Sequence, residues 1–319
     1  MAKRISELRR AITEELPATQ FVGAFPREQM SVIASAPGTG KTWFVVKSAM
    51  DLSAGEPMFC GMTPKQEPAK CVIMCGEGGF RMLTERFKKI ASPSNPENIS
   101  VYTLTDLAEA GVEISLDTKD GADNMMKIVA GEKADILYID SLIAFRDENE
   151  NEQQSTSRVL KKLITIARKC NCAVVATHHT RKRKRGDNGE LTQDDIIGSS
   201  AITRLCATAW TMGDDKESNY RTLQCVKTWF QQPETLYWRI TNDREGRVHF
   251  MRATGESFSI QRERALKYLV NSNGIVTIEQ VMEQAYVENQ AAKAAMDQFA
   301  ESGYGEITRV EGKYAISLK

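Results

Sequence analysis

Apolar and polar residues alternate along the chain in two kinds of pattern, one typical of strands and one typical of helices. Short, almost wholly apolar runs predict strands at residues 30–34, 71–75, 99–104, 136–139, 173–177, 207–212, 223–228, 236–241 and 248–252. Apolar positions at helical spacing predict helices between several of them, for example at residues 41–54 and 155–169. Strands that are apolar on both faces need cover on both faces, so the pattern favours an α/β fold with a mostly parallel sheet flanked by helices. The turn at residues 243–246 predicts that the sheet ends in an antiparallel hairpin.

The two ends of the chain have different patterns. Ile5, Leu8 and Ile12 form a narrow apolar stripe on a predicted helix at residues 4–15, which must pack on its own core or on a neighbouring subunit. At the other end, helical patterns at 260–271, 278–286 and 288–302 precede two alternating strands around Glu311-Gly312. Three helices and a hairpin in this order outline a winged helix. We expect an N-terminal arm at residues 1–24, a main domain at 25–255 and a winged-helix domain at 256–319.

Composition and charge narrow the class of protein. The 319 residues include 42 Lys and Arg against 42 Asp and Glu, which excludes a histone-like polycation but allows a local basic stripe. Hydrophobic residues make up 41%, too many for a disordered chain, yet no apolar run approaches the ~20 residues of a membrane span. The first residues carry charges where a signal peptide has its apolar stretch. These features predict a soluble, cytoplasmic protein.

Seven cysteines raise the question of a metal site. Cys170, Cys172, His178 and His179 lie close together in the sequence, but the chain has no C-x-x-C pair and the spacing is not that of zinc sites. Most of the cysteines stand inside apolar runs. Buried, reduced thiols are therefore the simpler interpretation.

The strongest chemical signal is the sequence Ser-Ala-Pro-Gly-Thr-Gly-Lys-Thr at residues 35–42. It follows an apolar strand and opens a helix, which is the context of a phosphate-binding P-loop. Small residues let backbone amides approach phosphate, and the helix N-terminus adds partial positive charge. The lysine is expected to reach the β- and γ-phosphates, and the last threonine to give an oxygen to Mg²⁺. The residues expected to bind the nucleotide are Ala36, Pro37, Gly38, Thr39, Gly40, Lys41 and Thr42.

Further polar side chains end strands at the same edge of the predicted sheet. Asp140 ends an apolar run and can hold Mg²⁺ beside Thr42. Glu77 follows the run at residues 71–75 and can activate an attacking water, although an ordinary solvated carboxylate is the alternative. His178 and His179 end a third strand, where an imidazole could donate to the γ-phosphate or contact Glu77.

In this order, the motifs resemble those of the RecA-like ATPases, and specifically of the plasmid RepA-type hexameric replicative helicases and their KaiC relatives. Three further motifs also resemble motifs of this family: Gly55-x-x-x-Phe-x-Gly61, Leu83-x-x-Arg86 and Gly198-Ser-Ser-Ala201. The resemblance covers residues 25 to about 240. It implies an ATPase, with ATP and Mg²⁺ bound between the subunits of a homo-oligomeric ring.

The resemblance also implies roles for individual residues. Lys41 and Thr42 would contact phosphate and Mg²⁺, Asp140 would hold Mg²⁺, Glu77 would act on the attacking water, His178 would sense the γ-phosphate, and Arg86 would lie near the nucleotide base. A neighbouring subunit would add a basic finger, because charge develops on the γ-phosphate during hydrolysis. Lys227 resembles that position, while Ile197 stands where the family often has an arginine.

Position and charge predict a DNA-binding loop after the histidine strand. In RecA-like rings this segment faces the pore, and here it holds five consecutive cations: Arg181, Lys182, Arg183, Lys184 and Arg185. A charge run is most often a solvated surface, but six copies in a ring would form a path for single-stranded DNA. The third helix of the predicted winged helix has one lysine and three acidic residues at 288–301, which suits the docking of a replication protein better than duplex DNA.

Together these features predict an ATP-dependent, ring-forming motor on single-stranded DNA, most simply the replicative helicase of a plasmid, phage or other mobile element. Two alternatives stay open. One is a KaiC-like or repressor-like switch in which ATP controls assembly and the winged helix docks a partner. The other is a recombination mediator that forms filaments on DNA.

Overall fold

The computed structural model describes residues 21–147, 153–181, 191–215, 220–243, 245–253, 270, 273–285, 289–301 and 305–318. The chain divides into two compact units, Met1–Ala253 and Thr254–Lys319. The predicted helices at 4–15 and 260–271 lie outside the described residues, apart from Val270. Of the predicted DNA-binding loop, only Arg181 is described.

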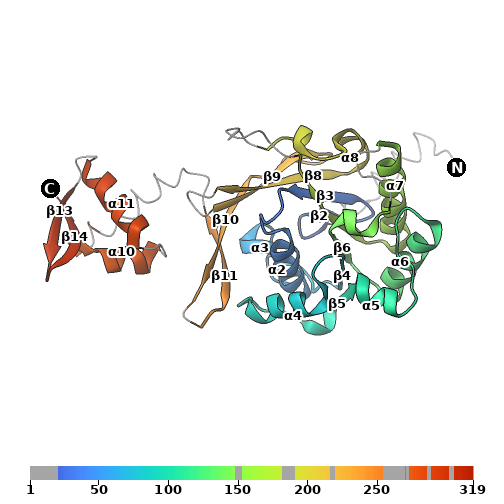
Figure 1. The fold of residues 1–319 in the computed structure, drawn as a ribbon, viewed down its shortest axis with the longest axis horizontal. Coiled ribbons are helices and arrows are strands. Elements are labelled where there is room, and N and C mark those ends of the chain that lie inside the picture. Colours follow the sequence, from blue (N-terminus) through green and yellow to red (C-terminus); the bar gives the residue numbers. More distant parts are fainter. Residues whose placement is uncertain are drawn as a thin grey trace, which may run out of the picture. The chain divides into compact units, whose positions relative to one another are not determined.

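A nine-stranded sheet forms the centre of the first unit (Figure 1). Its order is β11-β10-β9-β8-β3-β7-β6-β4-β5. The strands are β3 (Met30–Ser35), β4 (Cys71–Cys75), β5 (Ile99–Thr103), β6 (Ile136–Asp140), β7 (Ala173–His179), β8 (Thr208–Asp215), β9 (Tyr220–Thr228), β10 (Leu236–Asn242) and β11 (Val248–Ala253). Neighbours from β5 to β8 are parallel, and β8 to β11 are antiparallel to one another. The predicted, mostly parallel sheet with a final hairpin is confirmed.

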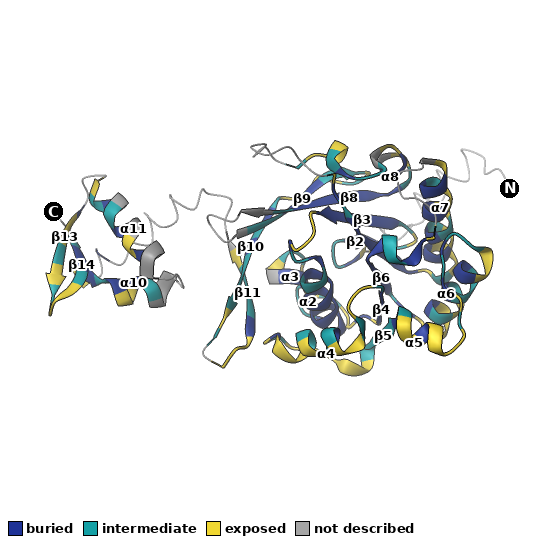
Figure 2. Ribbon diagram, viewed as in Figure 1, coloured by how far each residue is buried: buried dark blue, intermediate teal, exposed yellow. Residues whose placement is uncertain are grey.

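Helices cover both faces of this sheet, as the apolar strands required. The helices are α2 (Lys41–Ser53), α3 (Met58–Gly61), α4 (Gly79–Lys89), α5 (Leu104–Glu109), α6 (Lys119–Glu132), α7 (Gln153–Cys170) and α8 (Ser199–Leu205). Short 3-10 turns lie at η1 (Pro96–Asn98), η2 (Leu142–Phe145) and η3 (Gln193–Asp195), and β1 (Phe21–Val22) pairs with β2 (Phe25–Pro26). Along β6, Leu137 and Ile139 pack into the core beneath α6 and α7, whereas Ile136 and Tyr138 pack into the core beneath α2. Figure 2 shows these central strands as buried.

The second unit is a small α+β arrangement with its own core. It contains β12 (Ile275–Thr277), α10 (Ile278–Ala285), α11 (Asn289–Glu301), β13 (Gly305–Val310) and β14 (Lys313–Leu318). The three strands form an antiparallel sheet in the order β12-β14-β13. The turn of the predicted hairpin is confirmed, because Glu311 and Gly312 both have positive φ angles. The three-residue strand β12 was not predicted, since a run so short has no visible period.

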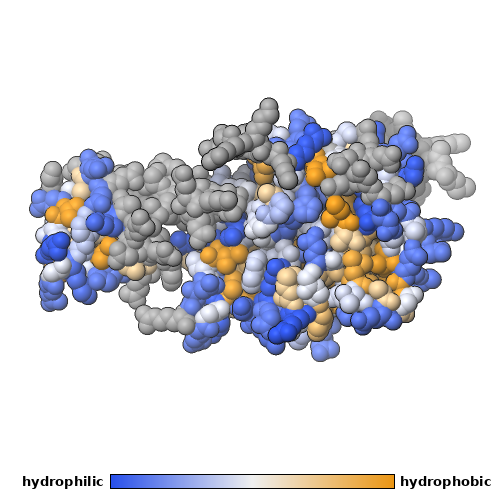
Figure 3. Space-filling model, in the orientation of Figure 1, coloured by the Kyte–Doolittle hydropathy of each residue, from blue (hydrophilic) through white to orange (hydrophobic). Residues whose placement is uncertain are grey.

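Hydrophobic residues lie mainly in these internal cores. On the face seen in Figure 3, hydrophilic side chains cover much of the described surface and hydrophobic ones form small patches between them. Within the described ranges, no helix has the length and apolar character needed to cross a membrane.

Candidate nucleotide-binding site

The P-loop connects β3, the middle strand of the nine-stranded sheet, to the first long helix. β3 lies between β7 and β8, and α2 begins at Lys41 directly after the loop. Gly38 and Gly40 have φ angles of 80° and 109°, which side chains with a Cβ rarely adopt. The two glycines therefore allow the tight turn that the motif predicted.

Lys41 folds back over this turn. Its Nζ donates to the carbonyl oxygen of Ser35 at 3.3 Å, to Ser35 Oγ at 3.1 Å and to the carbonyl oxygen of Ala36 at 3.2 Å. Burial lowers the pKa of the ammonium group, while the nearby carboxylates of Asp140 and Glu77 raise it. The structure thus brings the predicted cation and both predicted carboxylates into one electrostatic group.

The two carboxylates are held by hydroxyl groups of neighbouring residues. Thr177 Oγ1 donates to Asp140 Oδ1 at 2.6 Å, and Asp140 is only 4% exposed. Ser141 Oγ donates to Glu77 Oε1 at 2.6 Å. Parallel pairing of Cys75 with Asp140 brings the ends of β4 and β6 side by side, which is why these groups meet.

His178 lies beside this group, with its ring buried at the end of β7. Its Nε2 lies 3.0 Å from the carbonyl oxygen of Ile197, which can only accept, so Nε2 carries the proton. Burial lowers the pKa of His178 to about 4, and the charge of Lys41 acts in the same direction. The ring is therefore neutral at pH 7 and its Nδ1 is an acceptor. The expected contact with Glu77 is not formed, because Glu77 is held by Ser141 and His178 by Ile197.

Two arginines stack on tryptophans near the P-loop. The Arg86 guanidinium lies 5.3 Å from the ring centroid of Trp43, and its pKa is lowered by burial and raised by nearby Asp140. Arg221 Nε donates to the carbonyl oxygen of Thr39 at 2.7 Å and stacks on Trp238 at 5.3 Å. Arg86 thus lies on the Asp140 side of the loop. Its expected position near the nucleotide base stays a prediction.

Of the other predicted cations, the structure describes Lys227 and Arg181. Lys227 Nζ donates to the carbonyl oxygen of Cys206 and lies 4.2 Å from the ring centroid of Trp229, so both contacts are within the chain. Burial lowers the pKa of Lys227. Arg181 is exposed just after β7, and its backbone amide donates to the carbonyl oxygen of Asp195.

Sequence reasoning missed four residues of this site. Ser141 and Thr177 could have been found, because each adjoins a predicted residue at the end of a strand. Trp43 adjoins Thr42, but nothing in the sequence indicates that it stacks on Arg86. No sequence feature indicated Arg221. Its place beside the P-loop depends on the antiparallel pairing of β9 with β8, in which Arg221 lies opposite Asp214.

The residues present suit a magnesium nucleotide. A carboxylate and a threonine hydroxyl are oxygen ligands of the kind Mg²⁺ takes, and the buried Lys41 beside the two-glycine turn supplies positive charge for phosphate. The alternative zinc set is not supported, since the described residues contain no cluster of three or more metal-ligating side chains. The six cysteines whose side chains the structure describes are free thiols.

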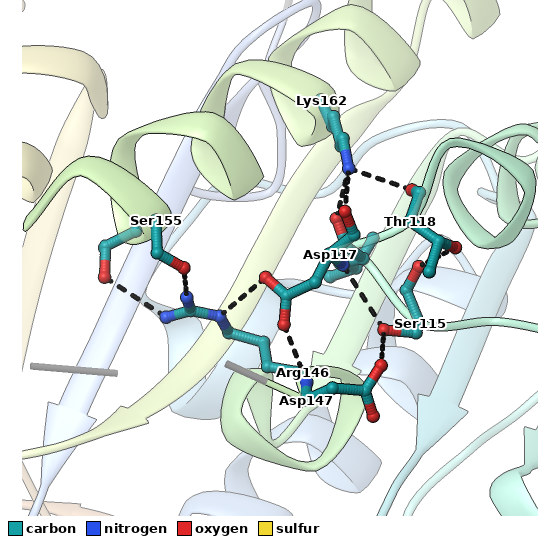
Figure 4. Close-up of polar contacts among 9 residues, drawn as sticks. Ser115, Asp117, Thr118, Arg146, Asp147, Ser155 and Lys162 are labelled. Atoms are coloured by element: carbon teal, nitrogen blue, oxygen red, sulfur yellow. Dashed lines mark hydrogen bonds and ion pairs between the residues drawn. The ribbon is translucent and has the colours of Figure 1, made fainter. Parts of the chain in front are cut away.

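A buried polar network fixes the segment that follows Asp140 (Figure 4). Arg146 donates to Thr156 Oγ1 at 3.1 Å and to Ser155 Oγ on α7, and its Nε lies 3.5 Å from Asp117 Oδ1. Lys162 Nζ donates to three carbonyl oxygens at residues 116–118. This network anchors the chain between β6 and α7 to the loop before α6.

The fold and the site define a P-loop ATPase of the RecA-like kind: a P-loop after the middle strand, an aspartate ending a parallel strand, and a glutamate on the next. The model of the AAA domain family matches residues 7–185, more than half of the chain, so the chain belongs to this family.

Comparisons with individual proteins add little to this assignment. No curated protein sequence matches the chain. Among solved structures, the crystal structure of the RadB recombinase is similar, with a TM-score of 0.46 and 19% sequence identity. That match covers 68% of this chain and 89% of the recombinase chain.

Proposed function

We propose that this protein is an ATP-driven, ring-forming motor on single-stranded DNA, and that it acts as the replicative helicase of a mobile element. The observation that carries the proposal is the position of the site residues relative to the basic residues 181–185. Lys41, Asp140, Glu77 and His178 converge at one edge of the sheet, and the strand that ends in the histidines leads directly into the cations at residues 181–185. One strand, β7, would thus join the nucleotide site to a segment that binds a polyanion.

The site residues divide the work of ATP hydrolysis. The backbone N–H groups of residues 36 and 38–42, together with Lys41, would hold the phosphates, since Pro37 has no N–H to donate. Thr42 and Asp140 would hold Mg²⁺, which would neutralise charge on the phosphate oxygens. Glu77 accepts a proton from the water that displaces ADP from the γ-phosphoryl group, and Ser141 orients the Glu77 carboxylate for this task. Lys227 of a neighbouring subunit would approach the γ-phosphate only after leaving Cys206 and Trp229.

His178 would report the state of the nucleotide through the backbone. Its Nε2–H is bound to Ile197, directly before Gly198 and the start of α8. Because the neutral ring has no second proton to donate, a direct donor bond to the γ-phosphate requires His178 to release Ile197. The contact with Ile197 therefore links the phosphate site to α8 and to the segment that carries residues 181–185.

Assembly and docking complete the proposed function. A ring, of six subunits by the resemblance, would place the loops at residues 181–185 around one DNA strand. The order of α10, α11, β13 and β14 suits a winged helix, and the mixed charge of α11 suits the docking of a replication protein.

The test is the rate of ATP hydrolysis with and without a poly-dT strand, for the wild type and Glu77→Gln. We expect strong stimulation by DNA, and loss of hydrolysis with ATP binding retained in the variant. Glu85→Gln on α4 is the matched control, because Glu85 is also exposed and lies outside the site. A slow rate that ignores DNA would favour the ATP-gated switch instead. Helical filaments in place of closed rings would favour the recombination mediator.

A further inference from the structure

A groove between α7 and α8 is lined by residues that take no part in the nucleotide site. The two helices lie side by side (Figure 1), and Arg204 on α8 donates to Ser157 Oγ on α7 at 3.3 Å. Two hollows lie beside this contact, with volumes of about 410 Å³ and about 290 Å³. Lys161 and Arg204 line both hollows, so the two form one groove.

The groove is positively charged. α7 contains five cations and no acidic residue, although the chain as a whole is balanced. Four cations line the groove and none of its lining residues is acidic: Arg158, Lys161 and Arg168 from α7, and Arg204 from α8. Such a concentration of one charge in a concave surface attracts a polyanion.

A large aromatic side chain lies at one end of the groove. Trp229 lines the second hollow, and 53% of its surface is exposed. The backbone amide of Trp229 donates to the carbonyl oxygen of Ala207 at 3.0 Å, which fixes the residue at the end of β9. Exposed tryptophan beside cations is the combination with which proteins bind single strands, since the cations track the phosphates and the ring stacks on a base.

The topology connects this groove to the proposed DNA loop. α7 starts near the carboxyl ends of β6 and β7, where Arg181 leaves the sheet, and runs back to the opposite edge, where Trp229 lies. At 1.5 Å per residue, positions 154 and 168 are about 21 Å apart, the length of a short single strand. We propose that the α7–α8 groove binds the sugar-phosphate backbone of single-stranded DNA and that Trp229 stacks on one of its bases. This inference rests on the proposed function, which supplies the ligand.

The role of the groove's positive charge is tested with the double variant Arg158→Ala/Arg168→Ala. Its affinity for a fluorescent oligo-dT of about 20 nucleotides is measured by titration at several salt concentrations. Loss of two phosphate contacts is expected to weaken binding about tenfold and to make the slope of log K against log salt shallower by about 1.4. The control is Lys119→Ala/Lys127→Ala, which removes two exposed cations from α6 and should leave the slope unchanged.

The base contact is tested with Trp229→Ala. Binding of oligo-dT should weaken about fivefold or more, with an unchanged salt slope, because no charge is removed. An abasic strand of the same length should bind the variant and the wild type equally. Equal loss on both strands would show that Trp229 supports the local structure, and would overturn the stacking.

The outcomes separate this inference from the proposed function. If the wild type binds oligo-dT and the groove variants bind it equally well, the groove is not a DNA site but the proposed function stands. If the wild type does not bind single strands at all, the proposed function fails first. If the groove variants change the oligomeric state in mass photometry and leave the salt slope intact, the groove contacts a second copy of the chain, which overturns the inference.

Discussion

Burial and neighbouring charge set the protonation states of two basic side chains of the nucleotide site, Lys41 and His178. Lys41 is almost buried, yet Asp140 and Glu77 support its positive charge. His178 is buried more deeply, so burial disfavours its charged form, and the charge of Lys41 acts in the same direction; the ring therefore stays neutral. The site therefore combines one fixed cation with one neutral imidazole, and the difference has a measurable effect on stability.

We expect His178→Gln to reduce the loss of stability in acid. In the wild type, the unfolded chain protonates this ring below pH 6.5 while the folded protein does not, so stability falls as the pH drops from 6.5 toward 4. The lowering of the pKa from 6.5 to about 4 corresponds to about 3 kcal/mol. Urea unfolding at a series of pH values should show a shallower decline for the variant, and equal declines would contradict the assignment.

Ser141 should act on hydrolysis through Glu77. Removing its hydroxyl in Ser141→Ala leaves the carboxylate without the contact at 2.6 Å, and we expect kcat to fall about tenfold with little change in KM for ATP. In a Glu77→Gln background the same change should have almost no further effect, because the two residues share one interaction. Independent, multiplying losses in the double variant would mean that Ser141 acts in another way.

At the scale of elements, the network around Arg146 determines where the chain leaves β6. The guanidinium side chain is 1% exposed and the Asp117 side chain 7%, so the pair is buried. The same aspartate accepts from the backbone amide of Asp147 at 2.6 Å, which ties the loop before α6 to the chain that follows η2. The positions of Arg146 and Asp147 thus depend on contacts with Asp117, about 30 positions earlier in the sequence.

Arg146→Met should destabilise the first unit. The change leaves Asp117 as a buried charge without its guanidinium, and loss of one partner of a buried pair costs about 3 kcal/mol or more. For a unit of this size we expect the midpoint of its thermal transition to fall by about 6–12 °C, measured by calorimetry. Arg146→Met/Asp117→Leu should recover part of the loss. A double variant less stable than the single one would refute this explanation.

At the scale of the whole molecule, the two units have separate cores. The core of the second unit is formed by residues between Val270 and Ile316, and all the described residues of the nucleotide site belong to the first unit. The strands and helices of each unit follow one another without exchange between the units.

A chain that ends at Ala253 should therefore still bind ATP. We expect its dissociation constant, measured by calorimetric titration, to stay within about twofold of that of the full chain. Circular dichroism should verify that the truncated protein is folded. A folded truncated protein that has lost ATP binding would show that the second unit contributes to the site.

Sequence patterns predicted most of the fold of the first unit. The central strands are almost entirely apolar because both of their faces are buried, and this composition is visible without a structure. The P-loop was visible for a similar reason, since its glycines and lysine are consecutive. Short elements were not predicted, among them β12 and the strand pair β1–β2, because two or three residues show no periodicity.

The sequence by itself determined which strands form the central sheet, where the P-loop turns and which carboxylates end the neighbouring strands, because these properties depend on local composition. Only the tertiary structure decided the partners of those groups: Ser141 for Glu77, Ile197 for His178, Trp43 for Arg86, and Arg221 for the P-loop backbone. The same holds for the groove between α7 and α8. Arg168 and Trp229 line one of its hollows although they are 61 positions apart in the sequence. Such contacts depend on strand order and helix packing, which hydrophobic periodicity does not encode.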